Sequence, residues 1–268
     1  GPCVYNPEPV AEFFDLINIG EGEEVLLEIC HLYNKMKAEG SYTRSAFLRE
    51  ACHIEGVYIP SLYDVSYNED GTIKAYTPVE ASVPATVQKR IIKDLDSVFY
   101  PESFVVPFTS IVHDRSQLEI QRGCLRGCRF CQAGIIYRPV REKSPEVLNN
   151  QAKCLYEATG YDEISLLSLS TSDYTELNEL LVNMLSWTED KRINLALPSL
   201  RIDNFSDELL EKIASVRKSG LTFAAEAGTQ RLRDVINKNI TEKDIMRSCA
   251  LAFAGGYTAV KLYFMIGL

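Results

Sequence analysis

From about residue 117 to the end of the chain, segments with the apolar pattern of β-strands alternate with segments of helical spacing. The expected strands are Leu118–Gln121, Glu163–Leu169, Ile193–Leu197, Leu221–Glu226 and Ala259–Ile266. The expected helices are Pro145–Thr159, Thr175–Trp187, Asp207–Lys218 and Glu242–Ala254. Repeated strand–helix units of this length predict an α/β fold in which helices cover a parallel sheet. About five strands that close on themselves, or nearly so, make a partial (β/α) barrel of the TIM-like kind.

The first part of the chain has a different pattern. Val10–Leu16 and Glu23–Lys37 have helical spacing, and a turn at Gly20–Glu23 separates them. Residues 55–110 hold short β-like pieces around a turn at Asn68–Gly71 and are punctuated by prolines. This pattern fits a helical and β-hairpin linker better than a second packed domain. The chain starts without methionine and stops inside an apolar run, so both ends are expected to be cut and the chain to be a fragment.

The composition excludes several classes of protein. The formal net charge is −9, from 37 acidic and 28 basic residues, and such a surface repels phosphate backbones. Broad nucleic-acid binding is therefore not expected, although a locally basic mouth could still accept one RNA loop or a small anion. No run approaches the ~18 apolar residues of a membrane span. The N-terminus also lacks the pattern of a signal peptide, so we expect a cytoplasmic protein with no membrane association.

Three of the eight cysteines crowd into one short segment. Cys124, Cys128 and Cys131 have the spacing C-x3-C-x2-C and lie on a glycine-punctuated loop directly after the first expected strand. The carboxyl end of such strands is the functional edge of parallel α/β folds. In a reducing compartment, clustered thiols indicate a metal site, whereas the five scattered cysteines are expected to be small apolar residues. Three thiolates on a 4Fe–4S cluster leave one iron open to another ligand.

Other interpretations of this segment are weaker. A structural zinc site needs a fourth cysteine or histidine, and the nearest histidine, His113, would have to fold back across the strand. An electron carrier of the ferredoxin type normally supplies four thiols to each cluster. The flanking glycines argue against a chance grouping of structural cysteines.

The segment resembles the signature of the radical S-adenosylmethionine (SAM) superfamily, in which an aromatic residue, here Phe130, precedes the last cysteine. The resemblance implies that the three thiolates hold a 4Fe–4S cluster and that its open iron takes the methionyl end of SAM. One electron then cleaves SAM to methionine and a 5′-deoxyadenosyl radical, which abstracts a hydrogen atom from the substrate. It also implies an electron donor such as flavodoxin or ferredoxin.

The longer string Gln121–Gly134, followed by Tyr137–Arg141, is similar to uncharacterised bacterial radical SAM proteins with an N-terminal cobalamin-binding domain. On this resemblance, residues 1–24 are the tail of a truncated cobalamin domain, residues 25–114 a linker, and residues 115–268 an incomplete radical SAM core. The Asp-x-His-x-x-Gly segment that ligates cobalt in many such domains is absent. Cobalamin is therefore expected only in the full-length protein.

The same resemblance implies further SAM-binding positions, which lie after successive strands. Phe130 is expected beside the adenine, and Ser168 and Ser170 occupy the slot that meets the amino group of SAM. Ser168–Ser172 also fits a helix N-cap. Ser199 and Arg201 are expected near the ribose and carboxylate, although Arg201 also fits a solvated loop arginine.

Residues from the last two expected strands complete this set. Glu226 resembles part of the superfamily's Glu-x-Gly segment. Lys238 stands where many relatives have arginine and lacks the forked geometry of a guanidinium. The strand end at Ile266 and Gly267 is expected against the adenine.

The sequence thus predicts a radical SAM enzyme that functionalises a C–H bond of an unknown substrate by methylation or methylthiolation, although the fragment itself is not necessarily active. Two alternatives remain: an RNA or ribosomal-protein methylthiotransferase, and a non-enzymatic iron–sulfur protein that senses redox state or carries electrons. Formation of 5′-deoxyadenosine separates the enzymes from the non-enzymatic protein.

Overall fold

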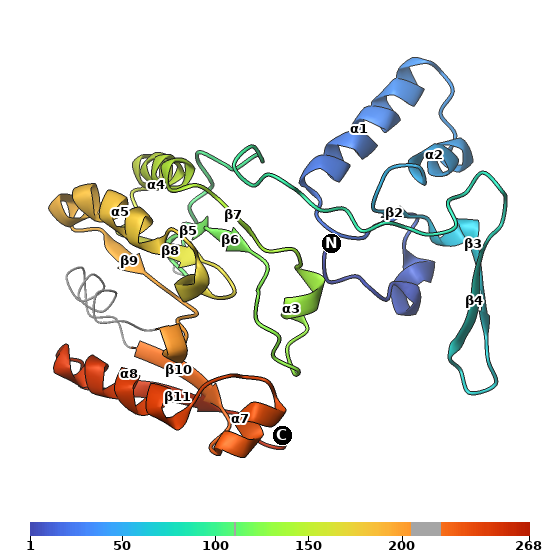
Figure 1. Cartoon of the computed structure of the whole chain (residues 1–268). Helices are drawn as coiled ribbons and strands as arrows, with labels where there is room; N and C mark the ends of the chain where they lie inside the picture. Colours follow the sequence, from blue (N-terminus) through green and yellow to red (C-terminus); the bar gives the residue numbers. More distant parts are fainter. Residues whose placement is uncertain (110, 205–220) are drawn as a thin grey trace. The chain divides into compact units, whose positions relative to one another are not determined.

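The computed structural model describes residues 1–109, 111–204 and 221–268 (Figure 1). They form two compact units, Gly1–Lys93 and Asp94–Leu268. No helix in these residues is both long enough and apolar enough to span a membrane.

The first unit is a small helical and β-hairpin assembly with a hydrophobic cluster of its own. Its elements are η1 (Glu8–Phe13), β1 (Ile17–Asn18), α1 (Glu23–Ala38), α2 (Arg44–Ala51), β2 (Val57–Tyr58), η2 (Pro60–Leu62), β3 (Tyr63–Tyr67) and β4 (Ile73–Pro78). Strands β3 and β4 pair antiparallel around the predicted turn, where Gly71 has a φ of +82°. The hairpin is therefore confirmed.

The core of this unit lies where the sequence pattern indicates a linker. Tyr58, Tyr63 and Tyr76 pack ring against ring, with centroids 5.1–5.9 Å apart. The hydroxyls of Tyr58 and Tyr76 both donate to the Glu8 carboxylate, at 2.7 and 3.2 Å. The helix predicted at Val10–Leu16 is wrong. A 3-10 helix at Glu8–Phe13 replaces it, because two prolines stand at its start and the segment is too short to nucleate an α-helix.

The second unit contains the predicted alternation of strands and helices. Its strands are β5 (Ser116–Glu119), β6 (Gln121–Arg122), β7 (Arg141–Glu142), β8 (Glu163–Leu167), β9 (Asn194–Ala196), β10 (Leu221–Glu226) and β11 (Val260–Phe264). Its helices are α3 (Ala133–Ile136), α4 (Pro145–Thr159), η3 (Thr171–Asp173), α5 (Leu177–Lys191), η4 (Ile202–Asn204), α7 (Gln230–Val235) and α8 (Glu242–Ala254). The helix predicted at Asp207–Lys218 lies outside the described residues.

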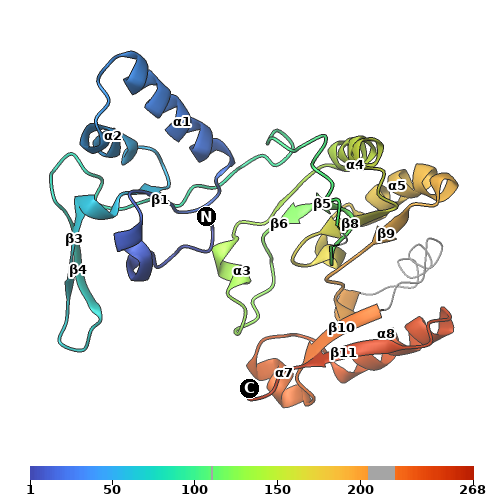
Figure 2. The ribbon, with the colours of Figure 1, turned by 180° about the vertical axis from the view of Figure 1, so that it is seen from behind.

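The main strands form two parallel sheets, β5-β8-β9 and β10-β11, as the fold prediction requires. Helices α4 and α5 pack together beside the first sheet, and α8 lies along the second (Figures 1 and 2). A single hydrophobic cluster contains residues of both sheets, among them Leu118, Leu166 and Phe223. Within the described residues no strand pair joins the two sheets and no closed barrel forms. The fold is a partial barrel.

Local signals explain why some predicted boundaries are correct. Ser144 caps α4 through a bond from the Val147 amide (3.4 Å), and Gly160 ends the helix in the left-handed conformation. Thr241 and Asp244 form a capping box at the start of α8. Helix α5 begins two residues later than predicted and ends four residues later, and its N-cap makes no side-chain bond.

Candidate functional site

The cysteine loop leaves β6 and ends at α3, at the carboxyl end of the first parallel strand. Cys124, Cys128 and Cys131 are partly exposed and form no disulfides. Gly123 starts the loop with a φ of +95°, and a β-carbon there would lie 2.7 Å from the Tyr137 carbonyl oxygen. Only glycine fits this close approach of two backbone segments.

The far side of the loop is attached to the segment that follows α7. The Asn237 side-chain amide donates to the Gly127 carbonyl at 2.8 Å, and the Arg129 amide donates to the Ile236 carbonyl at 2.9 Å. The Arg129 guanidinium also donates to the Val235 carbonyl. The loop is therefore attached to a segment of the same unit, residues 235–237, that is more than 100 residues away in sequence.

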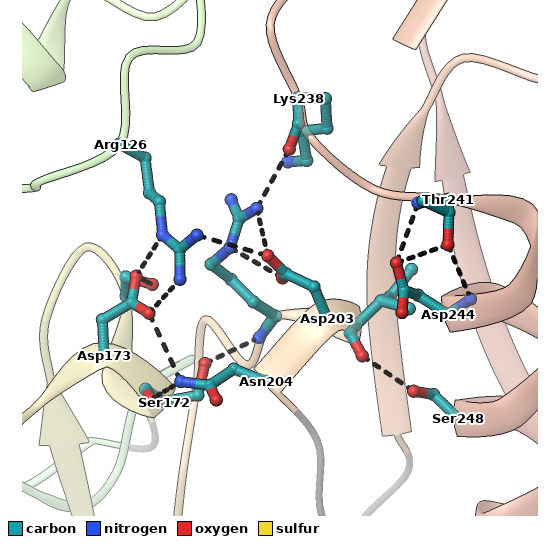
Figure 3. A network of polar contacts seen from close by, with 12 residues as sticks. Arg126, Ser172, Asp173, Asp203, Asn204, Lys238, Thr241, Asp244 and Ser248 are labelled. Carbon is teal, nitrogen blue, oxygen red and sulfur yellow. Dashed lines mark hydrogen bonds and ion pairs between the residues drawn. The ribbon is translucent and has the colours of Figure 1, made fainter. Parts of the chain in front are cut away.

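Between the first two cysteines, Arg126 points to two carboxylates (Figure 3). Its Nε donates to Asp173 Oδ2 at 2.8 Å and its Nη2 donates to Asp173 Oδ1. Its Nη1 lies 3.3 Å from Asp203 Oδ2. Asp173 belongs to η3, after β8, and Asp203 belongs to η4, after β9. The loops that follow three neighbouring strands thus meet at one arginine.

The charges of Arg126 and Asp173 stabilise each other. Burial of the Asp173 carboxyl opposes its ionisation, but hydrogen bonds from Arg126 and Ser170 outweigh that effect and hold the pKa of Asp173 below its ordinary value. The hydrogen bonds to Asp173 in turn raise the pKa of Arg126. Both groups are therefore charged at neutral pH.

A second arginine extends the network towards β10. Arg201 donates from Nε and Nη2 to the two carboxylate oxygens of Asp203 (2.9 and 3.0 Å), and Nη2 also donates to the Lys238 carbonyl at 3.0 Å. Lys238 Nζ lies 3.2 Å from Glu226 Oε1 and 5.9 Å from the ring centre of Phe130. Three predicted site residues, Arg201, Glu226 and Lys238, are thus linked to the cysteine loop or lie beside it.

The other predicted SAM-binding residues lie at or near strand ends. Ser170 is buried and donates to Asp173 Oδ2 at 2.7 Å, while Ser168 lies 2.9 Å from the Thr171 hydroxyl. Neither serine caps α5, whose N-cap is Glu176. Ile266 and Gly267 follow β11, and Ile266 is fully exposed.

Four non-glycine residues of this region have left-handed backbone. They are Ser199, Glu226, Asn237 and Asn239, with φ of +59°, +66°, +55° and +55°. Glu226 also lies at a register irregularity between β10 and β11. Left-handed backbone at non-glycine residues often accompanies a functional site.

The cysteines suit an iron–sulfur cluster by their donor chemistry, although their side chains do not converge on one point. Across the described ranges, no group of three or more His, Cys, Asp or Glu residues lies close enough together to hold a metal ion. The three partly exposed thiols nevertheless lie within eight residues on a glycine-containing loop, and cysteine thiolates are the usual ligands of 4Fe–4S clusters. Binding of a cluster therefore requires the loop to draw its sulfurs together.

A pocket of about 230 Å³ adjoins this loop. Its wall comes from the ends of β5 and β8, from β6 and from the start of the loop; it includes Glu119, Arg122, Gly123, Tyr137 and Ser168. The Arg122 guanidinium is paired with the Glu119 carboxylate at 2.8 and 2.9 Å. The pocket is thus a mixed apolar and polar space between Gly123 and Ser168.

Sequence patterns miss Asp173, Asp203 and Asn237, which connect the loop to the rest of the unit. Each is a common polar residue in an irregular segment, with no motif around it. One signal was available for the two aspartates. Both follow predicted strands at the edge where the cysteine loop lies, and the arginines of that loop pair readily with carboxylates.

Two family models match the chain. One, described as radical SAM superfamily, matches residues 118–268, which is more than half of the chain. The other, described as radical SAM proteins, N-terminal, matches residues 1–60.

The chain belongs to the radical SAM superfamily.

Residues 118–268 are thus a radical SAM core, the kind of core that uses a 4Fe–4S cluster and SAM. The resemblance predicted from the cysteine segment is confirmed.

Curated relatives are longer than this chain. An uncharacterised protein of Methanocaldococcus jannaschii is 31% identical over 271 residues, which cover 100% of this chain and 51% of that protein. The threonylcarbamoyladenosine tRNA methylthiotransferase MtaB of Aquifex aeolicus is 26% identical over 164 residues, covering 59% of this chain and 37% of that protein. The chain therefore spans about half, or less, of the length of these relatives.

Solved radical SAM structures share the fold. The methyltransferase TsrM from Kitasatospora setae, solved with cobalamin and a 4Fe–4S cluster, matches 95% of this chain and 47% of its own, with a TM-score of 0.59 and 15% identity. The cobalamin-dependent SAM radical enzyme OxsB matches 97% of this chain and 34% of its own, with a TM-score of 0.58 and 17% identity. The expected likeness to cobalamin-using members of the superfamily is confirmed at the level of the fold.

Proposed function

We propose that this chain is the catalytic core of a radical SAM enzyme that functionalises a C–H bond of its substrate, with methyl transfer as the leading reaction. The cysteine loop carries this proposal, because Cys124, Cys128 and Cys131 supply three thiolates at the carboxyl edge of a partial barrel. When held by Cys124, Cys128 and Cys131, a 4Fe–4S cluster would supply the electron for reductive cleavage of SAM and so the radical chemistry at the C–H bond of the substrate.

The polar residues around the loop would bind SAM, which carries an ammonium, a carboxylate and a sulfonium group. Glu226 and Lys238 form a pair of opposite charge beside Phe130 and match the ammonium and carboxylate of the methionyl end. Phe130, 40% exposed, offers its ring to the adenine. To bind the SAM carboxylate, the Arg201 guanidinium would have to contact SAM and Asp203 together or release Asp203.

The remaining contacts with SAM come from strand ends. Ser168 and Ser170 follow β8, Ser199 follows β9, and Ile266 and Gly267 follow β11. In a parallel fold these ends open at one edge, which suits a single ligand that touches several loops. The pocket between Gly123 and Ser168 then receives the part of the substrate that reacts.

The full-length protein is proposed to add the remaining parts. Cobalamin would bind to a domain of which residues 1–24 are the tail, and residues 25–114 would link that domain to the core at 115–268. A flavodoxin or ferredoxin would deliver the electron. The fold shared with TsrM over 95% of the chain supports methyl transfer.

The test is anaerobic reconstitution of the protein with iron and sulfide, followed by EPR of the reduced protein with and without SAM. We expect a 4Fe–4S signal that changes when SAM is added, together with formation of 5′-deoxyadenosine. Cys128→Ser should abolish both, whereas Cys154→Ser, in α4, should retain both. A full-length wild-type protein that forms the cluster but yields no 5′-deoxyadenosine under strong reductant would refute the proposal.

Methylthio transfer is the second candidate, because the chain matches a tRNA methylthiotransferase over 59% of its length. Such enzymes usually carry further clusters, so their iron content exceeds the four atoms of one cluster. Iron analysis of the full-length protein separates the two reactions: about four iron atoms per chain favour methyl transfer, and about eight favour methylthio transfer.

A further inference from the structure

We propose that Asp173 is a positioning residue that sets the conformation of the cluster-binding loop through Arg126. This proposal rests on the proposed function, since it concerns the loop assigned to the cluster. Arg126 lies two residues from both Cys124 and Cys128, so its side chain anchors the middle of the segment that joins two cluster ligands.

The contact between Asp173 and Arg126 has the geometry of a strong anchor. Two nitrogens of the guanidinium donate to the two oxygens of the carboxylate, and the Asp173 side chain is only 4% exposed. Bidentate, charge-assisted pairs of this kind fix direction as well as distance. A buried carboxylate that loses its cation is left in an unfavourable state, so separating Arg126 from Asp173 is costly even if the cysteines on either side move.

Asp173 itself is held in place by its own turn. Ser170 donates to Asp173 Oδ2 at 2.7 Å, and the Asn204 amide lies 3.4 Å from Asp173 Oδ1. The adjacent Ser172 accepts a bond from the Arg201 amide at 3.1 Å. The carboxylate is therefore held by residues of the segments after β8 and β9 as well as by Arg126 of the cysteine loop.

Asp203 connects the same arginine to the proposed SAM-binding residues. Its carboxylate contacts Arg126 at 3.3 Å and Arg201 at 2.9 Å. Because Ser170 and Arg201 belong to the proposed SAM-binding set, the network aligns the cluster-binding loop with those residues. Asp173 would thus act on the cluster without touching it.

Hydrogen exchange of the 268-residue chain tests this role. The variants are Asp173→Asn, which keeps the shape of the side chain, and Arg126→Gln, together with the double variant. Glu163→Gln is the matched control, since it breaks the Arg115–Glu163 pair (2.6 Å) at the opposite end of β8. Exchange is measured without cluster or SAM.

We expect the amides of residues 124–131 to exchange roughly tenfold or more faster in both single variants than in wild type. The double variant should be no faster than Arg126→Gln alone, because Arg126→Gln already removes the contact between Arg126 and Asp173. After reconstitution, the EPR signal and reduction potential should shift in Asp173→Asn but not in Glu163→Gln. Amides of α4 should stay protected in wild type and in all four variants.

Several outcomes would overturn the role of Asp173. The first is that the loop amides exchange at the same rate in Asp173→Asn as in Glu163→Gln. The second is that the effects of the two single variants on loop exchange add in the double variant. The third is that the amides of α4 lose as much protection as those of the loop, which would mark a merely structural residue. If Asp173→Asn does not fold, the decision rests on Arg126→Gln, in which exchange of the loop amides is compared with exchange of the α4 amides in the same way. A wild-type protein that binds no cluster overturns the proposed function instead, whatever the exchange of the loop.

Discussion

Replacement of Gly123 by alanine tests whether the start of the cysteine loop depends on a close approach of two backbone segments. Gly123 has a φ of +95°, and an added β-carbon would lie 2.7 Å from the carbonyl oxygen of Tyr137 and 2.8 Å from that of Pro139. Ordinary contacts of a β-carbon begin at 3.4 Å. Because both neighbours are backbone atoms, neither can turn away as a side chain would.

The expected magnitude follows from a matched control. Gly160 also has positive φ (+71°), but a β-carbon there meets nothing within 4 Å. Gly160→Ala therefore carries only the left-handed backbone strain, about 1–2 kcal/mol. Gly123→Ala carries comparable strain and an overpacking cost of about 1–3 kcal/mol. The free energy of unfolding should thus fall by about 2–5 kcal/mol at Gly123, clearly more than at Gly160.

Urea unfolding measures this difference directly. The single tryptophan, Trp187, lies in α5 and donates to Asn149 of α4 at 2.8 Å, so its fluorescence reports on the second unit. With a denaturant slope of about 2 kcal/mol/M, the midpoint of Gly123→Ala should lie roughly 0.5–1.5 M below that of Gly160→Ala. Equal midpoints for the two variants would refute the role of the close approach.

Three further changes have defined outcomes. Thr241→Ala removes the capping box of α8 and should lower the free energy of unfolding by about 1 kcal/mol, as measured by urea titration. Thr171→Val removes a buried hydroxyl that donates to the Pro198 carbonyl at 2.5 Å; we expect a loss of about 1–3 kcal/mol in the same titration, and no loss would contradict the importance of this bond. The pKa of Asp173 is lower in the folded protein than its ordinary value of about 3.9. Its contact with Arg126 therefore stabilises the fold fully above about pH 3.9, and this contribution is lost as the pH falls through the lower, folded-state pKa. Urea midpoints at pH 5.5 and pH 3 should therefore fall more steeply in wild type than in Asp173→Asn, and parallel curves would show that this pair does not contribute.

Sequence patterns located most of the second unit because its signals are local. Helices α4 and α8 and strand β10 have the predicted bounds, since a cap, a glycine or a change of periodicity marks each end within a few residues. Helix α5 lacks a side-chain cap, and its bounds differ from the prediction. The first unit was harder to predict, because its tyrosine core joins residues from separate short segments whose patterns are weak.

The cysteine motif determined the family from sequence alone, because all three ligands and the glycines around them lie in one short segment whose spacing is itself the chemical signal. The tertiary structure decided how that segment is held. Arg126 reaches Asp173 across 47 residues and Asp203 across 77, while Asn237 reaches Gly127 across 110. No local pattern encodes these contacts. They form because the parallel sheets place the ends of several strands, distant in sequence, at one edge of the fold.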